Sequence, residues 1–477
     1  MALAPRHPLI EEIETGLAPP SLFGLFRDDP FCFFLDSGMD HHKLGRYSFI
    51  GSRPFLVLRT RGRRAELIDD GGTTVLDDSD PFDLLRRLLD QYRLEPASLP
   101  VPFPGGAVGY LSYDLCHFVE RLPKTAVDDL ELPECYFGFY DRVVAIDNLE
   151  GKTWLVSTGF PELEESAWAA RAAERLAELK DKIEAAVAPS DPPVAVPAAV
   201  GLSGGFTHES YLAAVDRARD YIIAGDIFEV NLSQRFEAEL AVSPWELYRR
   251  LRQINPAPFA SYLDFDGVTI VGASPERFLR TRGDRVETRP IKGTRPRGRA
   301  PEEDDASASE LLASAKDRAE NVMIVDLERN DLGRVCRYGS VKVTELAALE
   351  VFPTVFHLTS TVEGRLRANR DRFDLLRAAF PGGSITGAPK VRAMEIIDEL
   401  EPTRRGVYTG SIGYLGFDGN MDLNIAIRGF VVRNGRAYFQ VGGAVVYDSD
   451  PESEYRETLD KARALFDALN APAAIER

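Results

Sequence analysis

The alternation of apolar and polar residues along the chain predicts a series of β-hairpins. Four tight-turn pairs, at 266–267, 283–284, 418–419 and 434–435, combine Gly with Asp or Asn. The runs beside them, including 268–273, 423–432 and 437–446, are rich in β-branched and aromatic residues and are expected to be strands. Several hairpins in succession imply large antiparallel sheets.

Other segments place apolar residues at helical spacing. Helices are expected at 245–253, 303–328, 389–400 and 451–469, and the run 161–187 has the same character. Ser243 caps the first of these, and Thr207 opens a further helix that Gly225 is placed to end. Helices interspersed with hairpins predict an α+β fold, in which large antiparallel β-sheets pack together with helices on the outside. The glycine spacings of the common nucleotide-binding loops do not occur.

A proline-rich stretch at 188–200 predicts a boundary between two regions. Its sequence, APSDPPVAVPAAV, suits neither a helix nor a central strand and is expected to be an exposed linker. It separates an N-terminal region, 1–187, from a C-terminal region, 201–477.

Composition excludes several classes of function. The chain has 477 residues, 57 of them Lys or Arg and 75 Asp or Glu, so its net charge is 57 − 75 = −18, which disfavours nucleic acid and anionic membranes as partners. No apolar run approaches the roughly 18 residues of a membrane span, and we expect no signal peptide. The four cysteines are far apart and form no CxxC pair, so neither a zinc ribbon nor a disulfide framework is indicated. A cytoplasmic protein fits these features.

Lys292, in the string PIKGT at 290–294, is the first candidate for chemistry. An amine nucleophile must lose its proton, which desolvation or nearby cations favour. Arg289, Arg295 and Arg297 lie within five residues of Lys292, so we expect its pKa to be lowered. A solvated strand end or a phosphate-contacting patch would show the same basic run.

Two pairs of carboxylates have the spacing of one helix face. Asp317 and Glu320 form the first pair, and Glu454 and Glu457 form the second. Ordinary surface salt bridges would explain either pair alone. The first helix, however, continues into the apolar run 322–327, which is unlike a solvated face. If both pairs face one cavity, their oxygens suit Mg²⁺, which takes its remaining ligands from water and an anionic substrate.

Several long strings occur in a fixed order along nearly the whole chain. They are GASPERF at 272–278, PIKGTRPR at 290–297, DRAENVMIVDL at 317–327, RNDLGR at 329–334 and FPGGSITGAPK at 380–390, preceded by FLDS at 34–37 and GGAVGY at 105–110. Together they resemble the chorismate-utilising enzymes, a family that includes the anthranilate, aminodeoxychorismate, isochorismate and salicylate synthases. The two N-terminal strings resemble the region shared by the amine-adding synthases of that family.

The resemblance implies that chorismate is the substrate and that Mg²⁺ is the cofactor. By position, Glu320 and Glu457 would ligate the metal, and Asp317 and Glu454 would support it. The residues that the resemblance places around the substrate are Arg428 and Tyr408 at the enolpyruvyl carboxylate, Ser384 and His357 at the ring, and the backbone of Gly442 nearby. Without the resemblance, His357 would be interpreted as a hydrogen-bonded strand histidine.

Lys292 distinguishes the branches of the family. Anthranilate synthases carry alanine at this position, whereas aminodeoxychorismate synthases can carry lysine. The resemblance therefore implies amination of chorismate at C4, giving 4-amino-4-deoxychorismate for 4-aminobenzoate and folate biosynthesis. Lys292 would attack C2, ammonia would enter at C4, and Glu276 matches the general acid, whose pKa burial would have to raise. Amination at C2 to give anthranilate is the second interpretation. The lysine of isochorismate and salicylate synthases acts on water and lies elsewhere.

The ammonia source and a regulatory ligand complete the expectations. None of the four cysteines lies in a glycine-rich nucleophile turn, so a separate glutaminase subunit, or free ammonia, must supply the nitrogen. The chain shows no pyridoxal-phosphate lyase and should stop at aminodeoxychorismate. In relatives the N-terminal region forms a tryptophan pocket, which here would include Ser37 and Pro256. A catalytically silent tryptophan-binding regulator is a third interpretation, and the complete set of acids with Lys292 argues against it.

Overall fold

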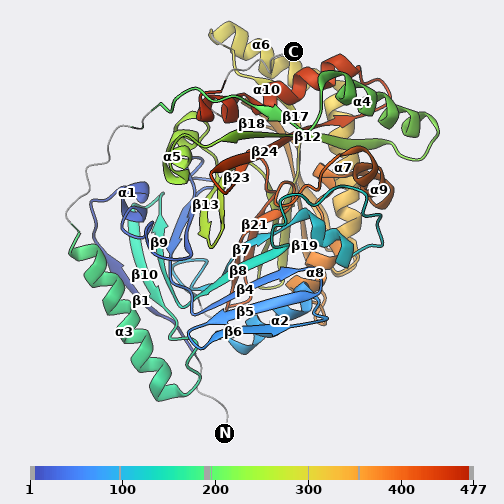
Figure 1. The fold of residues 1–477 in the computed structure, drawn as a ribbon. Coiled ribbons are helices and arrows are strands. Elements are labelled where there is room, and N and C mark those ends of the chain that lie inside the picture. The colour runs from blue at the N-terminus through green and yellow to red at the C-terminus, as the bar shows by residue number, and fades with distance from the viewer. Residues whose placement is uncertain are drawn as a thin grey trace.

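Two antiparallel β-sheets of twelve strands each form the centre of the molecule (Figure 1). The structure is a computed structural model that describes residues 6–95, 98–186, 194, 196–298, 300–352 and 355–471. The first sheet has the order β1 (Leu9–Ile13), β10 (Lys152–Ser157), β9 (Arg142–Asp147), β3 (Tyr47–Gly51), β2 (Cys32–Asp36), β13 (Phe259–Phe265), β14 (Val268–Ser274), β23 (Gly429–Arg433), β24 (Arg436–Val445), β12 (Glu229–Glu239) and β11 (Ser203–Gly204), and β20 (Gly387–Ala388) also pairs with β12.

The second sheet contains the remaining strands. Its order is β17 (Ile291–Pro296), β19 (Val355–Arg365), β16 (Arg285–Arg289), β15 (Arg277–Arg282), β22 (Met421–Asn424), β21 (Ser411–Gly416), β7 (Gly106–Leu111), β8 (Cys135–Tyr140), β4 (Leu56–Arg61), β5 (Arg64–Asp69) and β6 (Gly72–Leu76), and β18 (Lys342–Val351) also pairs with β19. Side chains of both sheets meet in one apolar layer that includes Phe33, Tyr110, Tyr136, Leu263 and Ile270. This layer holds the sheets together.

Helices lie outside the two sheets. They are α1 (Pro19–Phe23), α2 (Pro81–Gln91), α3 (Glu165–Glu184), α4 (His208–Ile223), α5 (Pro244–Ile254), α6 (Pro301–Ala313), α7 (Ala315–Gly333), α8 (Arg372–Ala379), α9 (Lys390–Leu400) and α10 (Pro451–Leu469), with short 3₁₀ turns at Tyr113–Phe118 and Gly383–Ile385. Helices α3, α5 and α10 pack on the first sheet, and α2, α7 and α8 on the second. The predicted α+β architecture is confirmed.

Both sheets combine strands from the two sides of the predicted linker. Strand β2 pairs with β13, with Phe34 opposite Tyr262, and β7 pairs with β21, with Gly109 opposite Gly413. Of the predicted linker 188–200, residues 188–193 and 195 lie outside the described residues. The division into 1–187 and 201–477 stays a prediction.

The four glycine turns join hairpins as predicted, but two predicted elements are interrupted. The run 303–328 forms two helices, because Ser314 ends α6 in an extended conformation and its hydroxyl then caps α7 by accepting a hydrogen bond from the Asp317 amide. The run 423–432 forms β22 in one sheet and β23 in the other, because the chain crosses between the sheets at Arg428, whose φ is 56°. This crossing sets Arg428 between the two sheets.

Within the described ranges, no helix is both long enough and apolar enough to cross a membrane.

Replacement of Gly109 by Ala should destabilise the fold. Gly109 lies in the middle of β7, between β21 and β8, and an added Cβ would come within 1.9 Å of the Tyr136 carbonyl oxygen. Overpacking of this kind lowers the free energy of unfolding by about 1–3 kcal/mol. Urea denaturation measures the change. Gly201→Ala is the control, because nothing lies within 4 Å of its added Cβ; equal stability of the two variants would contradict the expectation.

Candidate active site

Lys292 lies between the two sheets. It is on β17 of the second sheet, and its ammonium donates to Glu229 Oε1 at 2.6 Å and to Asn231 Oδ1 at 3.3 Å, both on β12 of the first sheet. Lys292 is 7% exposed and Glu229 is fully buried. Figure 1 shows β12 and β17 with α7 and α10 at the end of the molecule away from the N-terminus. The ion pair therefore joins the sheets where the two acidic helices lie.

The expectation of a lowered pKa for Lys292 is wrong for the protein without a bound ligand. Burial alone would lower the pKa of Lys292, but the carboxylates of Glu229 and Glu320 and the hydrogen bond to Glu229 outweigh burial and raise it. The neighbouring arginines are engaged by other acids: Arg289 by Glu345 and Glu350, Arg295 by Glu310 and Asp317, and Arg297 by Asp304. The basic run in the sequence therefore does not set the charge of Lys292.

Glu276 has the environment that a general acid needs. It follows β14 and is 4% exposed, and its Oε1 accepts hydrogen bonds from the Ser384 hydroxyl at 2.5 Å and from the Ile291 amide at 3.4 Å. Burial raises the pKa of Glu276 to about 7, although the hydrogen bond from Ser384 opposes this rise. A protonated fraction of Glu276 is therefore present at neutral pH. Ser384, predicted at the substrate ring, contacts this acid directly.

His357 is a buried neutral side chain beside β17. It lies on β19 opposite Thr294, and its Nδ1 is 2.9 Å from the Thr294 hydroxyl. Burial, with the charge of Arg428, lowers the pKa of His357 to about 3. The ring can thus form hydrogen bonds but carries no charge near neutral pH. The charge of Arg428 acts on it, so the two predicted substrate-binding residues lie in the same region.

Arg428 and Gly442 are connected through Lys461 of α10, and Tyr408 interacts electrostatically with Arg428. The Arg428 guanidinium donates to the Lys461 carbonyl oxygen, and the Lys461 ammonium donates to the Gly442 carbonyl oxygen at 3.0 Å. Burial raises the pKa of Tyr408 to about 12, so its phenol stays protonated. A guanidinium, a phenol and backbone groups at one position suit a carboxylate ligand.

The acidic residues of α7 and α10 interact electrostatically with the same two lysines, Lys292 and Lys316. Burial raises the pKa of Glu320 to about 7, against the opposing charge of Lys292. Lys461, 2.6 Å away, lowers the pKa of Glu457, and Lys292 and Lys316 lower it further. These shared electrostatic partners show that the two helices direct carboxylates toward the same region.

Glu454 and Asp317, the other two residues predicted at the metal, have different hydrogen-bond partners. Glu454 is 6% exposed, its Oε1 accepts from the Ser449 hydroxyl at 2.6 Å, and its buried Oε2 has no hydrogen-bond partner in the described structure. Asp317 is instead held by Arg295 at 2.9 Å. An unpartnered carboxylate oxygen fits a hard cation. Among the described residues no three His, Cys, Asp or Glu side chains converge as a complete metal site, so a cation here would need ligands from water or substrate.

The predicted tryptophan residues are adjacent. The Ser37 hydroxyl lies 2.7 Å from the Tyr47 carbonyl oxygen and 3.1 Å from the Pro258 carbonyl oxygen, and the Gly38 amide donates to the Ala257 carbonyl oxygen. These contacts bring residue 37 to the loop that contains Pro256, in the part of the molecule where β2 pairs with β13.

Sequence reasoning missed Glu229, Asn231 and the buried pair Glu401–Arg405. Arg405 donates to Glu401 at 2.7 Å and to the carbonyl oxygens of Asn231 and Ile385 at 2.7 and 2.9 Å. It thereby joins the strand that contacts Lys292 to the turn that holds Ser384. In the sequence, the only sign of these residues was Glu229 itself, a charged residue within the otherwise apolar start of the run 227–232.

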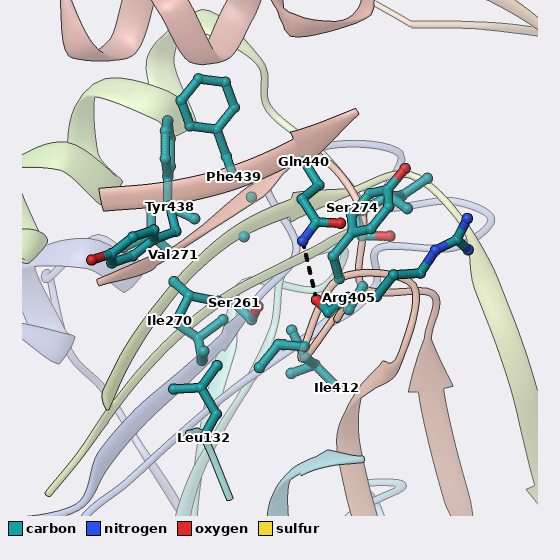
Figure 2. Close-up of a pocket in the computed structure, with 18 of the residues that line it drawn as sticks. Leu132, Ser261, Ile270, Val271, Ser274, Arg405, Ile412, Tyr438, Phe439 and Gln440 are labelled. Carbon is teal, nitrogen blue, oxygen red and sulfur yellow. Dashed lines mark hydrogen bonds between the residues drawn. The ribbon is translucent and has the colours of Figure 1, made fainter. Parts of the chain in front are cut away.

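An apolar cavity of about 40 Å³ lies between the sheets near Tyr408 (Figure 2). Figure 2 shows Leu132, Ile270 and Ile412 along it, and Gln440 donates to the Arg405 carbonyl oxygen at 3.4 Å. Since a cavity that binds benzene measures about 150 Å³, this space is too small for a ring-sized substrate. Of the site residues predicted from the sequence, Tyr408 is the one among its described lining residues. We assign the cavity to packing between the sheets.

Comparison with known proteins gives consistent matches. The family described as "chorismate binding enzyme" matches residues 31–467. Anthranilate synthase component 1 of Cereibacter sphaeroides is 44% identical over 91% of this chain and 88% of its own. Aminodeoxychorismate synthase component 1 of Bacillus subtilis is 41% identical over 90% of this chain and 92% of its own. The crystal structure of anthranilate synthase component I from Streptococcus pneumoniae superposes with a TM-score of 0.78 at 35% identity, covering 89% of this chain and 94% of that one.

Replacement of Ser384 by Ala should raise the pKa of Glu276 further. The Ser384 hydroxyl donates to the carboxylate and favours its charged form, so its removal favours the protonated form. Infrared titration of the protonated carboxyl band measures the shift, and Glu276→Gln identifies the band. Thr386→Ala, in the same turn but bonded to the Gly382 carbonyl oxygen, is the matched control. An unchanged or lowered pKa in Ser384→Ala would contradict the assignment.

Proposed function

Because the chain belongs to the chorismate-binding enzyme family, we propose that it aminates chorismate at C4 and forms 4-amino-4-deoxychorismate. The observation that carries this proposal is the position of Lys292. Its ammonium is buried between Glu229 and the acid-bearing helices, and Glu276 is near enough for the two charges to affect each other. An amine at this place can act as a nucleophile on a ring held beside it.

Two displacements at the ring would account for amination at C4. Lys292 attacks C2, both double bonds of the ring diene shift by one position, and the C4–oxygen bond breaks. Hydroxide is a poor leaving group, so Glu276 donates its proton and water departs. Ammonia then attacks C4, both double bonds shift back, and the C2–nitrogen bond to Lys292 breaks. The pKa of about 7 for Glu276 supports this role, because a protonated fraction is present at neutral pH.

The remaining predicted residues would bind and orient chorismate. Arg428 and Tyr408 would hold the enolpyruvyl carboxylate, assisted by the backbone at Gly442. His357 is neutral and hydrogen-bonded to Thr294, and it would line the pocket that holds the chorismate ring. Because it carries no charge, it would not draw the substrate carboxylates away from Arg428. Ser384 would orient the proton of Glu276 through their 2.5 Å contact.

The carboxylates of α7 and α10 fit Mg²⁺ that shares the substrate carboxylate. Glu320 and Glu457 would hold it, and Glu454 would contribute its unpartnered Oε2 directly or through water. Asp317, paired with Arg295, would be a supporting residue. Bound Mg²⁺ supplies positive charge at the ring carboxylate, which makes the diene a better electron acceptor.

Ammonia would come from a separate glutaminase subunit. Two relatives are described as component 1 of their synthases, which supports a second component for this chain as well. All four cysteines are buried, and burial raises their thiol pKa values, that of Cys336 to about 11. Such thiols are poor nucleophiles at neutral pH. A tryptophan ligand beside Ser37 and Pro256 is part of the same proposal.

Anthranilate formation is the second candidate function. The 44% identity to a relative described as anthranilate synthase component 1 favours it. In that reaction ammonia would attack C2 directly, and Lys292 would have no nucleophilic role.

Product analysis should separate the two functions. The protein is incubated with chorismate, Mg²⁺ and an ammonium salt, with and without an added aminodeoxychorismate lyase. We expect 4-aminobenzoate and pyruvate only when the lyase is present, because C4 amination alone retains the enolpyruvyl group. Chromatography with fluorescence detection measures both aminobenzoates. Release of fluorescent anthranilate without the lyase would establish C2 amination instead.

Chorismate without ammonia should leave a covalent adduct on Lys292. Attack at C2 with loss of water adds the mass of chorismate less one water, and no ammonia is present to displace the lysine. Intact-mass and peptide mass spectrometry measure and locate the adduct. Lys292→Ala should abolish it, whereas Lys390→Ala, at a lysine paired with Asp331, should retain it. An adduct that persists in Lys292→Ala would refute the nucleophilic role.

A further inference from the structure

Glu229 is a buried acid in contact with the nitrogen that the proposed reaction uses. It begins β12, it is 0% exposed, and its Oε1 lies 2.6 Å from Lys292 Nζ. Glu229 Oε1 also accepts a hydrogen bond from the side-chain amide nitrogen of Asn231 at 3.2 Å. Its Oε2 is buried without a hydrogen-bond partner in the described structure. A buried and half-satisfied carboxylate is costly for a fold to retain, which suggests that it has a role in the chemistry.

The other groups near Lys292 are unsuited to accept its proton. Asn231, its second partner, is an amide without basic character. Glu276 must already be protonated to release water from C4. Glu320 of α7 and Glu457 of α10 affect the lysine electrostatically, but no hydrogen bond joins either to it in the described structure, and Glu457 is paired with Lys461.

We infer that Glu229 is the base that takes the proton from Lys292 and returns it at the end of the catalytic cycle. This inference rests on the proposed C4 amination. Its basis is the short contact across the two sheets, the complete burial of Glu229 and its free second oxygen. Glu229 also keeps the lysine charged, and so unreactive, until a substrate is present.

The steps balance in atoms and charge. The Lys292 ammonium gives one proton to Glu229 and becomes an amine. The amine attacks C2, the C4–oxygen bond breaks, and hydroxide leaves as water with the proton of Glu276. The adduct is then a secondary ammonium, Glu229 is neutral and Glu276 is charged. Ammonia attacks C4 and Lys292 leaves as an amine, which recovers its proton from Glu229. The new C4 ammonium returns one proton to Glu276.

Proton transfer within the pair has a specific consequence for pH dependence. Because the proton moves from Lys292 to Glu229 without leaving the site, adduct formation needs no exchange with solvent. The rate should therefore only fall with rising pH, as Glu276 loses its proton around its pKa of about 7. In a protein that lacks the Glu229 carboxylate, the lysine must lose its proton to solvent. A rising limb should then appear at low pH, with a slope of about tenfold per pH unit.

The test measures the single-turnover rate of adduct formation by rapid quench and intact mass. The full chain is mixed with chorismate and Mg²⁺, without ammonia, from about pH 5 to about pH 9, a range that extends to either side of the Glu276 pKa of about 7. Glu229→Gln keeps the shape and a hydrogen bond to Lys292 but removes the base. We expect a bell-shaped profile and a rate at least about tenfold below wild type at the acidic end. Glu320, Glu276 and Glu457 remain in both proteins, so only a new rising limb is attributed to Glu229.

Controls separate the possible failures. Asn231→Ala removes the other lysine partner but no base, so its profile should keep the single falling limb. Where Glu229→Gln does not fold by circular dichroism, Glu229→Asp replaces it, and the retained carboxylate should slow the reaction without adding a rising limb. A wild-type-like rate and profile in Glu229→Gln, or a rising limb in Glu229→Asp, would overturn the inference while the nucleophilic role of Lys292 stands. Absence of any adduct in wild type would instead refute the proposed function, and this inference with it.

Discussion

The buried ion pair between Lys292 and Glu229 is the interaction on which the site depends. It joins β17 of one sheet to β12 of the other, at 2.6 Å, with both side chains nearly removed from solvent. Two charges in such a place are costly to desolvate, and each is tolerated because the other is present. Any displacement of one sheet relative to the other would expose or separate them. The site therefore requires the two sheets to keep their relative position.

The packing of the molecule provides that constraint. Both sheets contain strands from the N-terminal and C-terminal regions, and an apolar layer of large side chains fills the space between them. Near the Lys292–Glu229 pair, Arg405 donates hydrogen bonds to the Glu401 carboxylate and to the backbone carbonyl oxygens of Asn231 and Ile385. Burial favours the neutral form of both Glu276 and Lys292, but it prevails only at Glu276. Glu276 has no salt-bridge partner in the described structure and burial raises its pKa, whereas the Glu229 carboxylate beside Lys292 outweighs burial and keeps the lysine charged.

Local sequence signals predicted many of the elements and failed where tertiary contacts intervened. Helix α10 has the predicted bounds, because its apolar spacing and its N-terminal proline are local features. The run 423–432 satisfied the strand pattern throughout, yet the chain changes sheets within it at Arg428. Ser314 similarly interrupts the run 303–328, which the helical spacing of its apolar residues predicted to be one continuous helix. In both places one residue with a special conformation overrides an apolar pattern that extends on either side.

The sequence by itself determined the family, the α+β class and which residue types are available for chemistry, because these depend on motifs and periodicity that are local to the chain. It also indicated Lys292, but for a reason that the structure corrected. The charge state of Lys292 depends on Glu229, 63 positions away in the chain, and not on the three arginines beside it in sequence. Electrostatic interactions act through space and strengthen in a buried environment, so only the packing of two sheets could decide which charges the lysine meets.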